Sequence, residues 1–205
     1  MSDDGRRAGD GSAGGDAPYA SQALLLTPLP DGYHFRDYAP DIAWALHEID
    51  RLGTEQIARH GFPSLLDQPM PAMDWYADWL ASHIVFVAAD RLGRPVGFSV
   101  AAEAPAPESG GVFYLHMLSV HPDHGRRGIG AALLEANVSR ARWAYHNAMA
   151  LSTFRAVPFN APFYRRHGFI EADLDAVDAS LRERFGEEVP PGVLPSTRVL
   201  MMRRL

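Results

Sequence analysis

A glycine- and arginine-rich segment in the middle of the chain has the residue types of an anion-binding loop. It reads Gly125-Arg126-Arg127-Gly128-Ile129-Gly130, after a β-branched and aromatic run that ends at Val120. A strand that passes through such a loop into a helix directs several backbone N–H groups at one point, at the positive end of the helix dipole. Gly128 and Gly130 lack a Cβ atom, so a phosphate can approach the main chain, and Arg126 and Arg127 add positive charge.

The bland alternative for this segment is a tight strand-to-helix turn that uses glycine only for its conformational freedom. The two arginines and the Ala- and Leu-rich run that follows favour the anion site. The dinucleotide pattern Gly-x-Gly-x-x-Gly is not completed, because Leu133 stands at its last position. A Walker loop is excluded too, since no Gly-Lys-Ser/Thr follows the glycines.

A second segment with candidate chemistry lies about thirty residues further on. It reads Asn160-Ala161-Pro162-Phe163-Tyr164-Arg165-Arg166-His167-Gly168-Phe169 and predicts a short helix that ends at Gly168. Taken alone, Phe163 and Tyr164 are typical of packing residues in such a helix. Their order and spacing after the loop favour a functional role instead.

Together the two segments resemble the signatures of the GNAT superfamily of N-acetyltransferases. The family's loop pattern, Gln/Arg-x-x-Gly-x-Gly/Ala, is matched from Gly125 to Gly130, except that glycine replaces the first Gln or Arg. Arg126 supplies such a side chain one position later. The resemblance runs from about Tyr33 to the C-terminus. It implies acetyl-CoA as co-substrate and no metal. It also implies that the strand before the loop parts from the strand after the loop's helix.

The resemblance also implies roles for individual residues. Asn160 would hydrogen-bond the pantetheine or phosphate region, and Tyr164 would protonate the departing thiolate, which suits a phenol with a pKa of about 10. The strand before the loop would contact acyl-pantetheine through its main chain. The implied cofactor-binding residues are Leu118, Ser119, Val120, Arg126, Arg127, Gly128, Ile129, Gly130, Ala131 and Asn160.

His116 is the candidate catalytic base. Transfer of an acetyl group to an amine requires a proton acceptor, and many family members carry Glu on this strand, which residues 115–118 lack. A histidine titrates near neutrality. His-x-Leu-x-Val-His, from His116 to His121, resembles the arylalkylamine N-acetyltransferase branch. A hydrogen-bonded structural histidine, with a water relay for the proton, is the alternative.

Strand alternation predicts which side chains share a face with the histidine. It places Tyr114, His116 and Leu118 on one face and Leu115 and Met117 on the other. His121 and His124 form a His-x-x-His pair, but no third ligand accompanies them.

An aromatic and acidic stretch is a candidate wall for the acceptor site. Trp75 and Trp79 are spaced i, i+4 on one face of a predicted helix, with Asp74 and Asp78 on the neighbouring face. Such a patch would suit a cationic or aromatic amine. The alternative is that both tryptophans pack the helix onto the sheet while the aspartates are solvated.

The elements that must position these residues follow from the periodicity. The pattern indicates a mixed α/β fold (α+β). The resemblance implies the GNAT arrangement of such a fold, a mostly antiparallel sheet with splayed strands and flanking helices. Three roles remain open for the predicted helix 174–185: a cap over the cleft, a dimer contact, or an amphipathic cover. The predicted strands are 33–38, 84–89, 95–102, 112–120, 150–154 and 198–202, and the predicted helices are 40–52, 72–83, 130–147, 161–167 and 174–185.

Length, charge and composition limit the possible partners, domain organisation and location of the protein. The chain has 205 residues and a net charge of −6, which disfavours a nucleic-acid partner. Residues 1–21 are expected to be a disordered tail and residues 22–205 a single domain. No apolar run suits a membrane span or a signal peptide, so a cytoplasmic location is expected.

Cysteine is absent, which excludes a cysteine acyl-enzyme. The resemblance implies an N-acetyltransferase that moves acetyl from acetyl-CoA to a primary amine, and the missing cysteine favours direct attack in a ternary complex. The acceptor would be a small-molecule or peptide amine, and a homodimer is left open. The alternative is a non-catalytic acyl-CoA-binding sensor or scaffold with the same fold.

Overall fold

The computed structural model describes residues 28–103 and 111–205. The predicted boundary between a tail over residues 1–21 and a domain over residues 22–205 falls outside these residues. None of the helices in the described ranges is long and apolar enough to cross a membrane.

Within the described part of the chain, seven strands form one sheet in the order β1-β2-β3-β4-β5-β7-β6. All neighbours are antiparallel except β4 and β5, which are parallel. The predicted mixed α/β class with a mostly antiparallel sheet is confirmed. The short edge strand β6 was not predicted. The strands are β1 (Tyr33–Arg36), β2 (Ile84–Asp90), β3 (Pro95–Glu103), β4 (Val112–Val120), β5 (Ala148–Phe154), β6 (Ile170–Glu171) and β7 (Arg198–Arg204).

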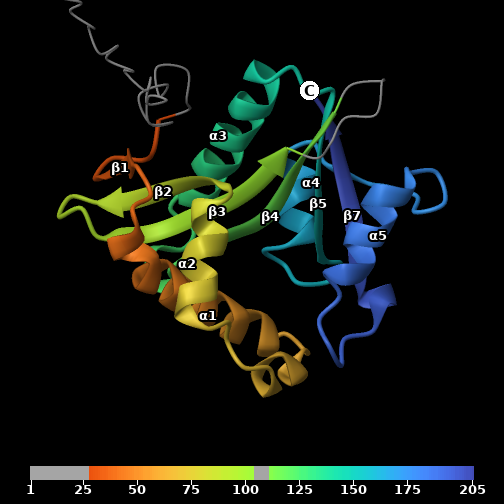
Figure 1. Cartoon of the computed structure of the whole chain (residues 1–205), viewed down its shortest axis with the longest axis horizontal. Helices are drawn as coiled ribbons and strands as arrows, with labels where there is room; N and C mark the ends of the chain where they lie inside the picture. Colours follow the sequence, from red (N-terminus) through yellow and green to blue (C-terminus); the bar gives the residue numbers. More distant parts are fainter. Residues whose placement is uncertain (1–27, 104–110) are drawn as a thin grey trace, which may run out of the picture.

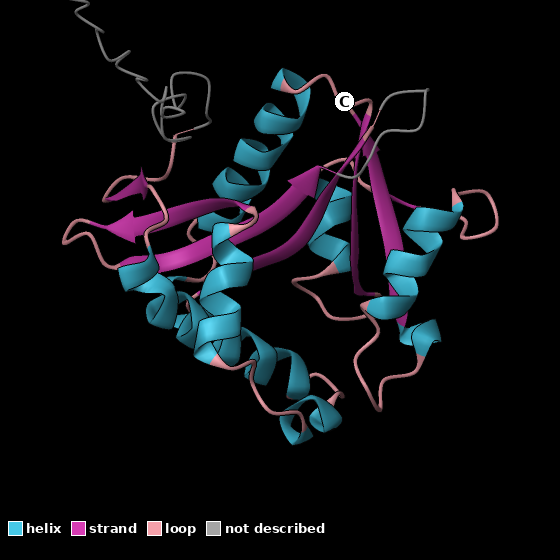
Figure 2. Ribbon diagram, in the orientation of Figure 1, coloured by secondary structure: helices cyan, strands magenta, loops and turns pink. Residues whose placement is uncertain are grey.

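Helices cover both faces of the sheet (Figure 2). On one face α1 and α2 pack over β2 and β3, and α5 packs over Tyr114, Ala150 and Leu200. On the other face α3 and α4 pack over Leu115 and Leu151. Consecutive strand residues thus belong to opposite cores, as strand alternation requires. The helices are α1 (Ala43–Ala58), α2 (Met73–Ala81), α3 (Ile129–Trp143), α4 (Ala161–Arg166) and α5 (Ala179–Glu187).

The parallel strands β4 and β5 part halfway along their length (Figure 1). Their pairing starts at Val112 and Ala148 and ends at Leu115 and Leu151. Beyond that point β4 remains paired with β3, and β5 remains paired with β7. The sheet therefore has an open seam in its middle, and the expected parting of these strands is present.

Helix α1 runs past the predicted end at Leu52. It continues through Gly53 to Ala58, with Leu46 and Ile49 buried against the sheet. A Cβ atom at position 53 would lie 3.3 Å from Ser119 Oγ of β4. The glycine therefore does not end the helix; it allows the helix to approach the strand closely.

Helix α5 is shorter than predicted. It begins at Ala179, because Asp178 caps it by accepting a hydrogen bond from Leu181 N–H (2.9 Å). Leu174 and Val177 precede the helix and still pack against the same core. The predicted helical start at Leu174 was wrong because the cap residue interrupts the apolar pattern.

Candidate active site

The loop between β4 and α3 has the backbone geometry of an anion site. Gly128, the N-cap of α3, has a left-handed backbone (φ 88°), and Arg126 also has a positive φ (58°). The bond from Ala132 N–H to Gly128 C=O (3.0 Å) closes the first turn of the helix. Within residues 28–103 and 111–205, the N–H groups of residues 126–131, which include Ile129 and Ala131, have no hydrogen-bond partner. These donors can bind a phosphate.

The two arginines of the loop have different surroundings. Arg127 donates to Tyr33 OH (3.0 Å) and to Asp123 C=O (3.0 Å), so it ties the loop to β1. Arg126 is exposed, and its side chain has no hydrogen bond or ion pair among the described residues. Arg126 is therefore the freer of the two cations for a ligand phosphate.

The two sequence segments lie next to each other in space. A Cβ atom at Gly130 would lie 3.8 Å from Cζ of Phe163 in α4 and 3.6 Å from Cδ2 of Leu118 in β4. The loop, the end of β4 and α4 thus meet at the start of α3.

Asn160 is the N-cap residue of α4. Its C=O accepts from the N–H groups of Phe163 (2.8 Å) and Tyr164 (3.1 Å). Its side chain does not cap the helix and has no hydrogen-bond partner among the described residues. The amide is partly exposed and free for a ligand.

Tyr164 lies where β4 and β5 part. Its side chain is 8% exposed and packs in the cluster that contains Leu115 and Leu151, the last pair of these strands. Within the described chain, its hydroxyl makes no hydrogen bond, although it is not fully enclosed. Burial raises the pKa of Tyr164, so the phenol stays protonated and can act as a proton donor.

The far end of β4 has one open edge. His121 N–H donates to Val96 C=O of β3 (2.8 Å). Because main-chain groups alternate along a strand, Ser119 also faces β3, whereas Leu118 and Val120 face the side that β5 has left. The main-chain groups of Leu118 and Val120, not those of Ser119, are therefore at the open edge.

A β-bulge at His116 changes which side chains share a face. Ala101 pairs with Leu115 and Val100 pairs with Met117, so His116 is the extra residue. After the bulge, Leu118 packs toward α3, and Met117 accepts a weak hydrogen bond from Tyr76 OH of α2 (3.9 Å). The predicted face assignment of Leu118 and Met117 was therefore wrong, because a bulge breaks the strict alternation.

His116 is held by two residues from the α5 region. Its Nδ1 lies 3.1 Å from Glu188 Oε1, and its Nε2 lies 3.2 Å from a guanidinium nitrogen of Arg184. Because an arginine can only donate, Nε2 accepts and Nδ1 carries the proton that it donates to Glu188. Glu188 also accepts from Tyr114 OH (2.7 Å), and Arg184 lies over the Tyr114 ring (4.9 Å). Both nitrogens of His116 are thus occupied.

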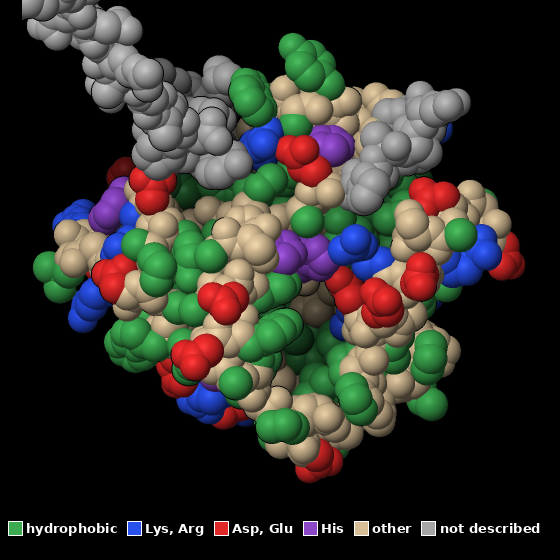
Figure 3. Space-filling model, in the orientation of Figure 1, with side chains coloured by type: hydrophobic (Ala, Val, Ile, Leu, Met, Phe, Trp, Pro, Cys, Tyr) green, Lys and Arg blue, Asp and Glu red, His purple; other side chains and the backbone are tan. Residues whose placement is uncertain are grey.

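Aromatic rings extend from His116 onto α2. His116 lies 5.3 Å from the His83 ring and 6.2 Å from the Trp79 ring, which stacks on Trp75. Tyr76 and Leu80 anchor α2 to the sheet, Trp79 packs partly buried against the same core, and Trp75 is 57% exposed. Figure 3 shows a hollow between α1 and α2 on one side and α5 on the other, with histidine and charged side chains at its rim. Asp74 and Asp78 are solvent-exposed.

Three further residues with notable surroundings were not predicted from the sequence. Glu188 and Arg184 are 72 and 68 residues from His116, and no local pattern links them to it. Asp50 follows Leu46 by one helical turn, so a carboxylate on the apolar stripe of α1 was an available signal. Burial raises the pKa of Asp50 to about 6, and no hydrogen bond to its carboxylate exists in the described residues.

No group of three potential metal-ligating side chains occurs in the part of the chain that the structure describes. His121 and His124 are near each other, with ring centroids 5.8 Å apart. His124 Nδ1 hydrogen-bonds with Tyr33 OH (2.9 Å).

The seam between β4 and β5 joins two chemically different sides. The anion loop, Asn160 and Tyr164 lie with α3 and α4 on one face. His116 and the aromatic rings of α2 lie on the other face, with Arg184 and Glu188. Because β4 and β5 are unpaired beyond Leu115, no strand pairing separates the two faces there.

Comparison with known proteins finds a family model that matches the middle of the chain. Residues 81–171 match the family model described as an acetyltransferase (GNAT) domain, and this stretch contains both segments singled out in the sequence. The family assignment made from those segments is confirmed.

Solved structures of the same fold span nearly the whole chain. A GCN5-related N-acetyltransferase from Rhodopseudomonas palustris is 19% identical (TM-score 0.60), covering 89% of this chain and 99% of its own. An acetyltransferase from Streptococcus agalactiae is 15% identical (TM-score 0.62), covering 85% and 99%. Naa50 from Arabidopsis thaliana, solved with the bisubstrate analogue CoA-Ac-MVNAL, is 15% identical (TM-score 0.59), covering 85% and 99%. These likenesses confirm the fold.

Proposed function

Because the chain carries a GNAT acetyltransferase domain, we propose that it transfers an acetyl group from acetyl-CoA directly to a primary amine. The observation that carries this proposal is the meeting of the anion loop and Tyr164 at the point where β4 and β5 part. The bisubstrate complex of the Arabidopsis Naa50 structure supports the pairing of CoA with an amine substrate in this fold.

The residues present fit acetyl-CoA. The unpartnered N–H groups of residues 126–131 and the free Arg126 suit the phosphates. Asn160 offers a free amide to the phosphate or pantetheine region, and the open edge at Leu118 and Val120 offers main-chain groups to pantetheine. The main chain of Ser119 would not bond pantetheine, because it faces β3; Ser119 would only hold its two neighbours, Leu118 and Val120, at the open edge.

The transfer step breaks one bond and forms another. The amine nitrogen attacks the thioester carbonyl carbon, the C–N bond forms, and the C–S bond breaks. Tyr164 donates its phenolic proton to the departing sulfur, and the amine loses a proton to a base. The absence of cysteine leaves no cysteine thiolate to hold the acetyl group between steps.

His116 is the residue to which we assign the proton from the amine. Its Nε2 lone pair becomes available when the bound acceptor displaces Arg184 from it. Glu188 behind Nδ1 then stabilises the imidazolium. A water relay that bypasses His116 is the competing route.

The proposal is tested by thiol release from acetyl-CoA in the presence of a panel of small amines, amino acids and short peptides. We expect CoA release that depends on an added amine, together with an acetylated product of matching mass. Tight acetyl-CoA binding without release on any amine would overturn the enzyme assignment.

That contrary result would favour a second function, an acyl-CoA-binding sensor or scaffold. The observation in favour of this second function is that both nitrogens of His116 already have partners. No other histidine on β4 could then accept the proton from the amine. Mass spectrometry of the amine after long incubation separates slow turnover from none.

A further inference from the structure

Arg198, at the start of β7, is a buried cation with an incomplete set of partners. Its side chain is 9% exposed, and its guanidinium lies over the Phe154 ring (4.7 Å) and donates to Ser152 Oγ (2.6 Å). Its Nε is fully buried and has no hydrogen-bond partner in the described residues. Burial lowers the pKa of Arg198.

Within the described chain, no carboxylate forms an ion pair with Arg198. Glu188 acts on it only through space, and Glu188 itself is bonded to Tyr114 and His116. A buried charge is costly unless it is paired. The guanidinium therefore lacks the anion that would normally accompany it.

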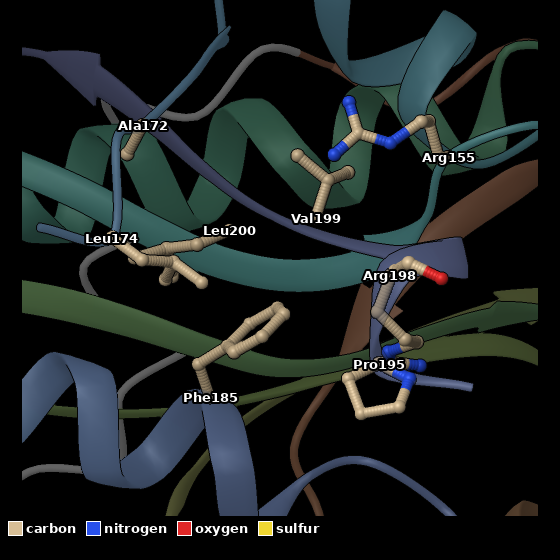
Figure 4. Close-up of a pocket in the computed structure, with 9 residues that line it drawn as sticks. Arg155, Ala172, Leu174, Phe185, Pro195, Arg198, Val199 and Leu200 are labelled. Carbon is tan, nitrogen blue, oxygen red and sulfur yellow. The ribbon is translucent and has the colours of Figure 1, made fainter. Parts of the chain in front are cut away.

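A small hollow of about 230 Å³ lies beside this guanidinium (Figure 4). Arg198, Pro195 and Ser196 form part of its lining, and Phe185 and Leu174 form an apolar wall. Arg155 also lines it, but unlike Arg198 it already has a carboxylate partner, Glu171, which it shares with Arg165. No acidic side chain lines the hollow. Its volume is below the usual range for ligand pockets, so it suits a small group.

Arg198 also connects this hollow to the open seam. The hydroxyl that it holds belongs to Ser152, which directly follows Leu151, the last β5 residue paired with β4. Leu200 of the same strand face packs under α5 with Tyr114. An anion at Arg198 is therefore on the His116 face of the sheet and next to the point where acetyl transfer is proposed.

We propose that the amine acceptor also carries a carboxylate, and that Arg198 binds this carboxylate while an apolar side chain occupies the hollow. The acceptor class is then a small amino acid or a related amino carboxylic acid. This inference rests on the proposed acetyl transfer. A carboxylate accepting from the terminal guanidinium nitrogen that Ser152 does not occupy would neutralise the charge of Arg198.

The test compares matched acceptors with the wild-type protein: phenylalanine, phenylalaninamide and phenethylamine, and the corresponding leucine series. We expect kcat/KM roughly 10- to 100-fold higher for the acid of each series, the size expected for hydrogen bonds to charged groups. Equal or faster acetylation of the amide and the plain amine in both series would overturn the proposal.

A variant identifies the responsible residue. Arg198→Gln should remove the preference by lowering kcat/KM for the acid only, whereas Arg198→Lys should keep part of it. Arg59→Gln, the same replacement at an exposed end of α1, should leave it unchanged. A preference that persists in folded Arg198→Gln would contradict the assignment.

A binding measurement separates this inference from the proposed function. Calorimetry of the wild-type protein with 3-phenylpropanoate and with 3-phenylpropanamide needs no turnover and no variant. Binding of the acid alone supports the anion site even if no amine is acetylated. Equal binding, or no binding of the acid, overturns it.

Discussion

At Tyr164, burial and an unpartnered hydroxyl occur together. The ring packs in the core, but its oxygen stabilises nothing else in the described structure. Tyr164→Phe should therefore fold normally and bind acetyl-CoA as the wild type does. Loss of the proton donor should lower kcat roughly 100-fold. Steady-state kinetics beside calorimetric acetyl-CoA binding checks this, and an unchanged kcat would remove the acid role.

Asp50 predicts a pH dependence of stability. Its folded pKa, about 6, is above its ordinary value of 3.8, so the native state binds the proton more tightly than the unfolded state. Below about pH 4 the Asp50 carboxyl is protonated in both the folded and the unfolded state, so its burial costs no charge. As the pH rises through about 6 the native state must bury a carboxylate, and the free energy of unfolding falls.

Asp50→Asn should remove this dependence and stabilise the protein at pH 7 by about 1 kcal/mol, after allowance for partial exposure. Denaturant unfolding from pH 4 to pH 7 measures it. Asp31→Asn, at an exposed position in the turn before β1, is the matched control and should change nothing. Parallel pH curves for wild type and Asp50→Asn would contradict the account.

The pairing of His116 with Glu188 predicts how the rate depends on pH. His116→Ala should flatten the acidic limb of the kcat/KM profile, because the group that must be deprotonated is gone. Glu188→Gln should lower kcat/KM, because the amide no longer stabilises the imidazolium that forms on proton transfer. An acidic limb retained in His116→Ala would favour the water relay.

At the scale of elements, the two loop glycines serve different purposes. Gly128 needs its left-handed backbone (φ 88°), and a Cβ there would lie 3.3 Å from Pro30 Cγ. Gly130 is helical, and a Cβ would meet only ordinary contacts at 3.6 Å or more.

Gly128→Ala should therefore cost about 1–2 kcal/mol of stability and weaken acetyl-CoA binding. Gly130→Ala, its matched control, should be neutral or stabilising by up to about 1 kcal/mol and should keep binding. Thermal unfolding with and without acetyl-CoA measures both effects. Equal losses in the two variants would show that backbone conformation is not the reason for Gly128.

Sequence patterns predicted the elements whose signals are local. The sequence correctly predicted three elements: the strand that leads into the loop, the helix that follows the loop, and the short helix that carries Tyr164. Each is marked within a few residues by the period of its apolar residues or by glycines and arginines. The bulge at His116 has no such mark, since it depends on how β3 pairs with β4. The length of α1 was missed for a similar reason: Gly53 is explained only by Ser119 across the interface.

The partners of the candidate site were less predictable than the loop. Glu188 and Arg184 reach His116 only because α5 folds back over β4 and β7. The sequence showed an amphipathic helix there but not what it contacts. In the sequence Arg198 is simply the first residue of a predicted strand. Only the structure shows that its side chain is buried without an anionic partner.

At the scale of the whole molecule, one sheet separates two binding sides and opens between them. The loop proposed to bind phosphate is on the α3 and α4 side, and His116 is on the side of α1, α2 and α5. Beyond Leu115 and Leu151 no strand pairing separates the sides. This arrangement suits the proposed reaction, in which an acetyl group presented from one side is attacked by an amine bound on the other, without being held by the protein.

Initial-rate kinetics with both substrates varied tests this central claim most directly. The measurement uses acetyl-CoA and the best amine from the panel. Direct transfer requires both to be bound at once, so we predict double-reciprocal lines that intersect, with no CoA released when the amine is omitted. Parallel lines, together with a burst of CoA in the absence of amine, would show an acetylated protein intermediate and contradict the account.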